Sequence, residues 1–291
     1  MAASIRSLLG AALLAAVLPA QAIVGGSSTP DFKDVGGNPG GGLGSGVQIT
    51  DQWVLTARHV GWNVGTSFSN GYGSTTVAER FNLGPGPFPA NDLALLRLAA
   101  PLGGGGVSLL NFVIPAGELL VPLPVTIATG LNHSSGSYAG TRGYGATFLG
   151  EVWNSADPDG SGPLPPVPVN WLIAYTPTFG QPYVQGGDSG GGLFLRHVTD
   201  SVSPLMGITS AFISANPPSG PLYASGFVQI AAYRSWIDST ITSAGFAAPL
   251  WITPVPEPAS YAMMAFGLLL VVALVRPRVQ RRRYGDGSLP A

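Results

Sequence analysis

Residues 53–59 read Trp-Val-Leu-Thr-Ala-Arg-His, a short apolar run that ends in a histidine. Aromatic and β-branched residues favour a strand, so this stretch predicts a strand with a titratable side chain just beyond its end. Working outward, two other stretches carry one reactive side chain each: Asn-Asp-Leu-Ala-Leu-Leu-Arg-Leu at 91–98 and Gly-Asp-Ser-Gly-Gly at 187–191. The chain thus presents a histidine, an aspartate and a serine in that order.

These three residue types suit nucleophilic catalysis. A serine hydroxyl is a weak nucleophile at neutral pH, so Ser189 needs a base to accept its proton, and His59 is the candidate base. A carboxylate bonded to the other imidazole nitrogen fixes the tautomer and stabilises the imidazolium, which is the role predicted for Asp92. The backbone N–H groups of Gly187 and Ser189 are expected to form an oxyanion hole, because a glycine turn leaves them unobstructed.

The three stretches resemble signatures of the chymotrypsin/trypsin-like serine proteases, in that family's chain order. The resemblance runs from Ile23 to about Ser243 and implies two antiparallel six-stranded β-barrels with the active site between them. His59 and Asp92 would come from the first barrel and Ser189 from the second, with the crossover near residues 115–124.

Composition independently predicts an all-β chain. The 42 Gly and 27 Pro lie between short Val, Ile, Leu and Thr runs, as many strands joined by turns require. One helix is expected near the C-terminus, where Ile230, Tyr233, Ile237 and Ile241 have the spacing of one apolar helical face, joined by Trp236.

Charge and cysteine content exclude other classes. A net charge of −1 gives no basic surface for nucleic acid. The absence of cysteine excludes disulfides and thiolate sites, and favours a bacterial exported enzyme with a sizeable core. His133 and His197 lack helical ligand spacing and are interpreted as structural or surface residues, so neither a metal site nor a cofactor is predicted. Calcium binding through oxygen ligands stays open.

The family resemblance implies an activation ion pair. Mature relatives begin Ile-Val-Gly-Gly, and their new α-amino group pairs with the aspartate before the nucleophile; Ile23 and Asp188 match these positions here. Residues 1–22 have a basic start, an apolar run and the ending Ala20-Gln21-Ala22, the layout of a signal peptide. Signal peptidase cleavage after Ala22 would therefore create the activating terminus directly.

The resemblance also assigns a substrate-binding region. Trypsin-like members carry an aspartate six residues before the nucleophile, whereas this chain has Tyr183, so cleavage after Arg or Lys is not expected. The remaining candidates are the strand residues Ser210, Ala211 and Phe212 and the pocket wall Gly226, with Ser210 also expected near Asp92. Tyr183 and Phe212 are expected to narrow the pocket toward small or modest apolar side chains.

The C-terminal segment has three parts. We expect a protease domain at 23–244, a Pro-rich linker at 245–260 with Pro256-Glu257-Pro258, a hydrophobic helix at 261–275 and a basic tail at 276–291. This order resembles the PEP-CTERM sorting signal of Gram-negative bacteria, which implies removal by an exosortase; an uncut membrane anchor is the alternative. Both interpretations of this segment place the protease domain outside the inner membrane, in the extracellular space or at the cell surface.

The sequence therefore predicts a secreted serine endopeptidase that acts on polypeptides. Two alternatives stay open: a protease-fold surface or matrix protein that binds without cutting, and an esterase that uses the same triad.

Overall fold

The structure is a computed structural model of the 291-residue chain. It describes residues 23–41, 43–130, 142–156, 166–176, 182–196, 203–215 and 222–253. The predicted signal peptide, the hydrophobic segment 261–275, the basic tail, His133 and His197 all lie outside these ranges. Within them, no helix has the length and apolar character needed to cross a bilayer.

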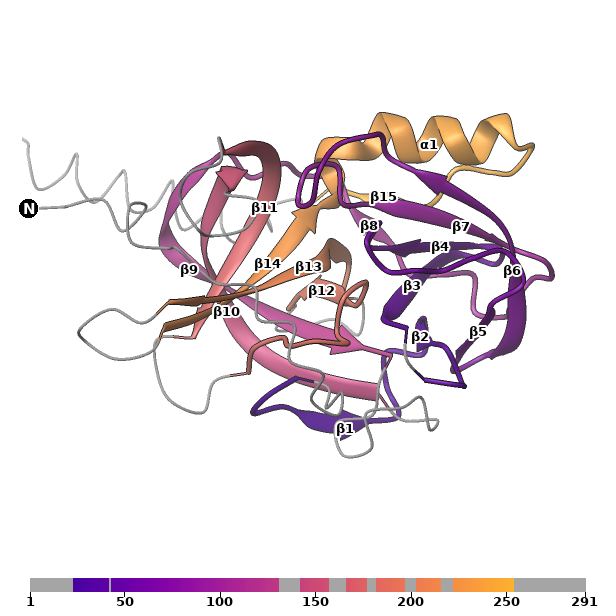
Figure 1. The fold of residues 1–291 in the computed structure, drawn as a ribbon, viewed down its shortest axis with the longest axis horizontal. Coiled ribbons are helices and arrows are strands. Elements are labelled where there is room, and N and C mark those ends of the chain that lie inside the picture. Colours follow the sequence, from indigo (N-terminus) through magenta and orange to yellow (C-terminus); the bar gives the residue numbers. More distant parts are fainter. Residues whose placement is uncertain are drawn as a thin grey trace, which may run out of the picture. The chain divides into compact units, whose positions relative to one another are not determined.

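The first half of the domain is a closed antiparallel barrel, seen on the right of Figure 1. Its core holds Trp53, Leu55 and Phe68, none of which is accessible to solvent. Strand pairing runs β2-β3-β4-β7-β6-β5, with bounds β2 (Val35–Gly37), β3 (Ser45–Thr50), β4 (Trp53–Thr56), β5 (Ser67–Asn70), β6 (Gly73–Asn82) and β7 (Ala94–Leu98).

The pairing of β4 with β7 places two of the predicted site residues. Thr56 at the end of β4 lies opposite Ala94 at the start of β7. His59 follows β4 and Asp92 precedes β7. Because the two strands are antiparallel, both residues lie at the same edge of the barrel. A buried antiparallel pair thus brings together residues 33 positions apart.

The second half is a ring-like sheet, seen on the left of Figure 1. Pairing follows β9-β10-β11-β14-β13, and β12 then pairs with both β13 and β9. The bounds are β9 (Gly117–Thr129), β10 (Arg142–Ala156), β11 (Val167–Thr176), β12 (Gly192–Leu195), β13 (Leu205–Ala215) and β14 (Leu222–Gln229). Short strands join it: β1 (Ser27–Thr29) pairs with β10, and β8 (Leu109–Leu110) lies parallel to β13.

The predicted all-β chain with a C-terminal helix is confirmed. A 3₁₀ turn, η2 (Ile230–Tyr233), leads into helix α1 (Arg234–Ser243), which buries Ile237 and Ile241. The predicted crossover at 115–124 is wrong, because β9 of the ring already begins at Gly117. The apolar and proline residues from Gly117 on belong to the first part of β9, which pairs with β10.

The fold continues past the helix. Strand β15 (Trp251–Ile252) lies parallel to β8, and the Trp251 indole donates to Asp238 of α1 at 2.8 Å. Phe246 packs edge-on against Trp53, with ring centroids 5.8 Å apart. Residues 245–253, the start of the segment expected to be a linker, are therefore part of the packed domain.

Candidate active site

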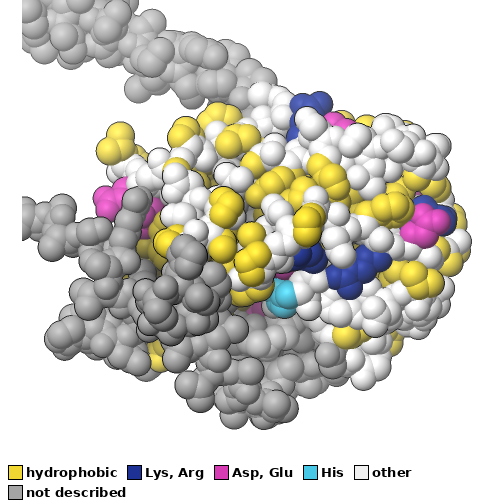
Figure 2. Space-filling view, turned by 45° about the horizontal axis from the view of Figure 1, so that its top comes forward, with side chains coloured by type: hydrophobic (Ala, Val, Ile, Leu, Met, Phe, Trp, Pro, Cys, Tyr) yellow, Lys and Arg dark blue, Asp and Glu magenta, His cyan; other side chains and the backbone are white. Residues whose placement is uncertain are grey.

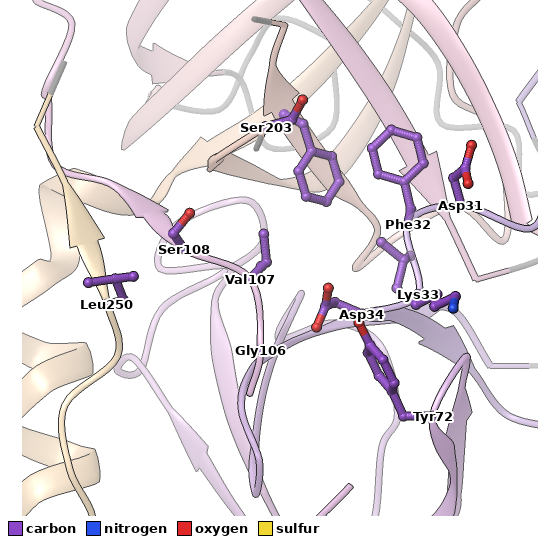
Figure 3. A pocket seen from close by; sticks show the side chains of 12 residues that line it. Asp31, Phe32, Lys33, Asp34, Tyr72, Gly106, Val107, Ser108, Ser203 and Leu250 are labelled. Atoms are coloured by element: carbon purple, nitrogen blue, oxygen red, sulfur yellow. The ribbon is translucent and has the colours of Figure 1, made fainter. Parts of the chain in front are cut away.

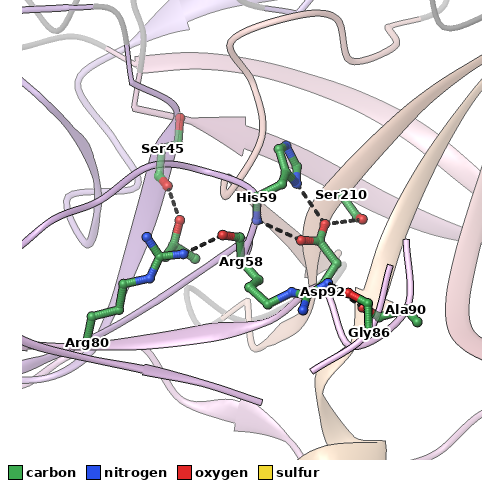
Figure 4. A network of polar contacts seen from close by, with 9 residues as sticks. Ser45, Arg58, His59, Arg80, Gly86, Ala90, Asp92 and Ser210 are labelled. Carbon is green, nitrogen blue, oxygen red and sulfur yellow. Dashed lines mark hydrogen bonds and ion pairs between the residues drawn. The ribbon is translucent and has the colours of Figure 1, made fainter. Parts of the chain in front are cut away.

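The buried carboxylate of Asp92 is the centre of the candidate site (Figure 4). Its side chain is inaccessible to solvent. Oδ1 accepts the backbone N–H of His59 at 2.9 Å, and Oδ2 lies 2.8 Å from His59 Nδ1. The Ser210 hydroxyl donates to Oδ2 at 2.5 Å. Because three donors surround the carboxylate, its negative charge is satisfied and the imidazole is held by one nitrogen.

A β-bulge aims Ser210 at Asp92. The register of β13 against β14 shifts between Thr209 and Ala211, so Ser210 is the extra residue. A bulge redirects one side chain out of the normal alternation, and here it turns the hydroxyl toward the barrel. The second half of the domain thereby contributes to a site built mainly by the first.

The other face of His59 remains accessible. Its side chain is 35% exposed, and the Phe88 ring packs edge-on against it with centroids 5.3 Å apart. In Figure 2 a histidine side chain, coloured cyan, lies at the surface near Lys and Arg side chains, coloured dark blue. Since Nδ1 is bound to Asp92, the remaining nitrogen, Nε2, is the one available for proton transfer.

Arg58 fastens the loop that carries Phe88 and Asp92. Its guanidinium donates to the carbonyl oxygens of Gly84 at 3.0 Å, Gly86 at 2.7 Å and Ala90 at 2.9 Å (Figure 4). The planar fork of arginine suits several carbonyl acceptors at once. The sequence pattern predicted no role for Arg58, although its position directly before His59 could have suggested one.

The turn at 187–191 is fixed from both halves of the domain. The Ser189 carbonyl accepts the Ser45 N–H of the barrel at 2.6 Å, and Gly190 and Thr209 are joined by a 2.8 Å hydrogen bond. Gly190 has φ 83°, and a Cβ there would lie 2.0 Å from the Ser45 carbonyl oxygen. Only glycine fits, so the turn approaches the barrel closely.

The reactive groups of this turn are partly free. Gly187 has φ 99°, and in the described part of the chain neither its N–H nor that of Ser189 donates a hydrogen bond. The two predicted oxyanion donors are thus available to a ligand. Among the same residues, no hydrogen bond joins the Ser189 hydroxyl to the His59 ring, so that contact stays a prediction.

The predicted activation partners do meet. The Ile23 backbone N–H donates to Asp188 Oδ2 at 3.0 Å, and both residues are fully buried. Burial raises the pKa of Asp188 to about 7, although the amides of Gln185 and Ile23 and the Thr129 hydroxyl favour its ionised form. Neutral amide and hydroxyl donors do not fully offset the desolvation of this carboxylate.

Three aromatic rings gather beside the turn. Tyr183 stacks on Tyr223 with centroids 4.8 Å apart and on Phe212 at 5.6 Å. Tyr183 and Phe212 were predicted from the sequence, but Tyr223 was not, because its position depends on the pairing of β14 with β13. Tyr183, Phe212 and Tyr223 thus form one stacked aromatic cluster.

Ala211 and Gly226 lie on the face of the sheet opposite to Phe212. They are paired across β13 and β14, and a Cβ on Gly226 would lie 3.1 Å from the Trp171 ring. Their neighbours Phe212 and Ser225 point the opposite way, and Ser225 accepts the Val184 N–H beside Tyr183. The structure therefore brings Phe212, but not Ala211 or Gly226, to the aromatic cluster.

A barrel and a ring-like sheet that meet at a carboxylate, an imidazole and a glycine turn bearing serine define a serine peptidase of the hydrolase class. The family model described as Trypsin matches residues 23–237, and the chain belongs to this family. No curated protein sequence matches it. In the described ranges, no group of three His, Asp or Glu side chains is placed to hold a metal ion.

Replacing Arg58 tests whether its three hydrogen bonds stabilise the loop. Arg58→Met should lower the free energy of unfolding by about 2 kcal/mol, because three carbonyl oxygens lose a charged donor. The matched control is Arg97→Met, which removes a surface ion pair with Glu79 and should cost clearly less than Arg58→Met because solvent screens that pair. Unfolding in guanidinium chloride measures the free energy of unfolding of both variants. Equal losses of stability in the two would contradict this role of Arg58.

Proposed function

We propose that this chain is an endopeptidase that cleaves peptide bonds through His59, Asp92 and Ser189. The observation that carries the proposal is the hydrogen bond between buried Asp92 and accessible His59, at the edge of the barrel to which the Ser189 turn is bound. We interpret the ring-like sheet as the second barrel of the family fold.

The proposed reaction proceeds by acyl transfer. Ser189 Oγ attacks the scissile carbonyl carbon while its proton passes to His59 Nε2, and Asp92 stabilises the imidazolium. The Gly187 and Ser189 amides donate to the oxygen that becomes negative. His59 then gives the proton to the leaving amine, and water repeats the sequence to release the acyl group from Ser189.

The reaction requires Ser189 Oγ to approach His59. Catalytic hydrogen bonds are often long or misaligned without substrate and shorten when it binds. Ser189 is only half-buried, so its hydroxyl can change rotamer without displacing the core. The fixed parts of the site are the carboxylate, the imidazole and the turn, and the hydroxyl is the part that moves.

A fluorophosphonate probe tests the nucleophile. The wild-type chain should be labelled on Ser189, and Ser189→Ala should abolish labelling and lower peptide hydrolysis by about 10⁶-fold. The control Ser235→Ala alters an exposed hydroxyl on α1 and should leave both unchanged. A wild-type chain that labels no better than Ser189→Ala would indicate a binding protein with a protease fold instead.

We further propose that the enzyme prefers small residues on the acyl side of the cleaved bond. The stacked rings of Tyr183, Phe212 and Tyr223 support this preference because they occupy volume beside the turn. No carboxylate stands at position 183 to attract a basic side chain.

Peptide-library profiling tests this preference. Cleavage should follow Gly, Ala or Ser, and Tyr223→Ala should raise kcat/KM for Leu relative to Ala at that position by about tenfold, as space for added methylenes opens. The control Tyr72→Ala changes an exposed ring between β5 and β6 and should not alter the ratio. A wild-type enzyme that favours Arg, Lys or Phe would refute the proposal.

Activation is proposed to accompany export, with cleavage after Ala22 freeing the amine of Ile23. Ile23 has φ 33°, a conformation that a β-branched residue rarely adopts. Once residue 22 is removed, no peptide bond precedes Ile23 and this restriction ends. The freed ammonium would then lie where the amide now contacts Asp188, and a cation there favours the ionised carboxylate.

The pH dependence of stability tests this pairing. With Ala22 attached, the pKa of Asp188 is about 7 when folded, so between about pH 4 and pH 7 the folded chain holds a proton that the unfolded chain has lost. Its stability should therefore fall as pH rises through this range. A chain beginning at Ile23 should show a smaller fall. Asp188→Asn should reduce the fall of the longer form to the part contributed by Asp34, whose pKa burial raises to about 6. Identical profiles for the two forms in denaturant unfolding would contradict the ion pair.

A further inference from the structure

Four exposed apolar side chains lie outside the candidate active site, on the segment that leads from β8 into β9. Phe112 is 53% exposed and Val113 48%, and further along Leu120 is 102% exposed and Val121 77%. We call these four residues the apolar patch. Figure 2, in which the top of Figure 1 comes forward, shows hydrophobic side chains over the upper part of the ring-like sheet. Grouped apolar exposure of this kind marks a surface that contacts another apolar body.

Buried neighbours hold both exposed pairs over the same part of the core. Leu110 and Ile114, on either side of the first pair, are buried in one cluster, and Leu119 packs against that cluster. The Ile114 N–H donates to the Gln229 side chain at 2.6 Å, which fixes the chain directly after Val113. The exposure of the patch is therefore set by packed neighbours.

A large β-bulge projects Leu120 and Val121 from the sheet. Four residues of β9 lie between its paired positions 118 and 123, whereas β10 has only Gly150 between the two partner positions. A bulge moves its extra residues out of the ladder, and Leu120 is as accessible as in an unfolded chain. The tip of the bulge, Leu-Val-Pro at 120–122, carries no charge.

Two prolines argue against a β-strand as the partner of this patch. Pro122 lies in the bulge and Pro124 in the paired strand after it. Proline has no N–H, so this part of β9 cannot donate the ladder of hydrogen bonds that a second copy or a peptide would need to extend the sheet. The partner is therefore recognised through the apolar side chains.

The described chain ends beside the patch. Strand β15 runs parallel to β8, and Asn111 donates through its N–H to the Ile252 carbonyl at 2.8 Å and through its side chain to the Thr253 hydroxyl at 3.1 Å. Asn111 directly precedes Phe112, so Thr253 lies next to the first exposed pair. Leu250, which is 67% exposed at one side of a pocket of about 630 Å³ (Figure 3), adds apolar surface to the same pair of strands.

An apolar run follows Thr253 after a short connection. Seven residues, 254–260, of which three are proline, separate Thr253 from the charge-free run 261–275. Seven extended residues span at most about 25 Å. With the run held in a bilayer, the patch would be confined close to the lipid surface. Such confinement raises the effective concentration of lipid, so a modest apolar surface suffices for docking.

We propose that the apolar patch docks on the surface of a lipid bilayer, with Leu120 and Val121 inserted below the headgroups. Transfer of exposed apolar side chains into lipid is favourable. Glu118 pairs with Glu151 across β9 and β10 at the base of the bulge. Neutral headgroups that carry an ammonium, such as those of phosphatidylcholine, therefore suit this surface better than anionic headgroups. This inference does not depend on the catalytic role of Ser189.

Single-cysteine labelling tests the proposal on the whole chain, which has no cysteine of its own. The chain is incorporated into phosphatidylcholine vesicles with an environment-sensitive fluorophore on Val121→Cys. The emission should shift to shorter wavelength, and it should be quenched by nitroxide-labelled lipid but not by iodide in the water. The matched control is Val64→Cys, at a valine 68% exposed in the turn before β5. Its label should keep an aqueous emission and be quenched by iodide alone.

A second variant separates docking of the patch from anchoring by the run 261–275. With the fluorophore on Val113→Cys, the double substitution Leu120→Asp and Val121→Asp should lower the docking equilibrium constant at least about tenfold, because two apolar side chains lose burial in lipid. Replacing part of the phosphatidylcholine by phosphatidylglycerol should also weaken docking, because the charges of Glu118 and Glu151 oppose an anionic surface. Circular dichroism establishes that each variant is folded.

Three results would overturn the proposal: a chain that does not associate with the vesicles, labels at 121 and 64 that are equally accessible to iodide and to lipid nitroxide, or unchanged lipid quenching in the double variant. Docking that strengthens with phosphatidylglycerol would overturn the assignment of neutral headgroups. If the double variant does not fold, the comparison of Val121→Cys with Val64→Cys decides, because both replace an exposed valine.

Discussion

The charge on one buried carboxylate links the two halves of this domain. Asp92 belongs to the first barrel, yet one of its three donors, Ser210, comes from the ring-like sheet. A buried carboxylate that loses a hydrogen-bond donor is costly, so separating the halves would remove the Ser210 hydrogen bond from Asp92 at an energetic cost. The first barrel orients the imidazole through Asp92, and docking of the second half adds the third donor to the carboxylate.

Strand β13 contacts both the Asp92 side and the Ser189 side of the site. Ser210 of β13 contacts Asp92, and its neighbour Thr209 is hydrogen-bonded to Gly190 of the serine turn. Adjacent residues of a regular strand point to opposite faces, but the bulge at Ser210 changes that alternation locally. The barrel reinforces this arrangement, because Ser45 contacts Ser189 and lies beside Gly190.

The sequence predicted those features that depend on strand ends and local turns. His59 and Asp92 are brought together because each flanks a buried strand, and Gly190 is required where two backbones approach. It did not predict features that depend on register. Tyr223 joins Tyr183 through the pairing of β14, and Gly226 faces Trp171 through the pairing of β14 with β11. The bulge in β13 turns Ser210 toward Asp92. Neither bulges nor long-range pairing have a local sequence signal strong enough to place single side chains.

Guanidinium groups connect distant segments of this chain where many secreted proteins use covalent links. Arg58 ties the histidine loop to residues 84–90, and Arg142 of β10 ties the ring-like sheet to β2 and its approach. With no cysteine in the sequence, no disulfide contributes to the shape of the site, which rests on packing and hydrogen bonds. Such contacts also re-form spontaneously after a thermal opening, whereas a broken disulfide would have to find its partner and an oxidant again.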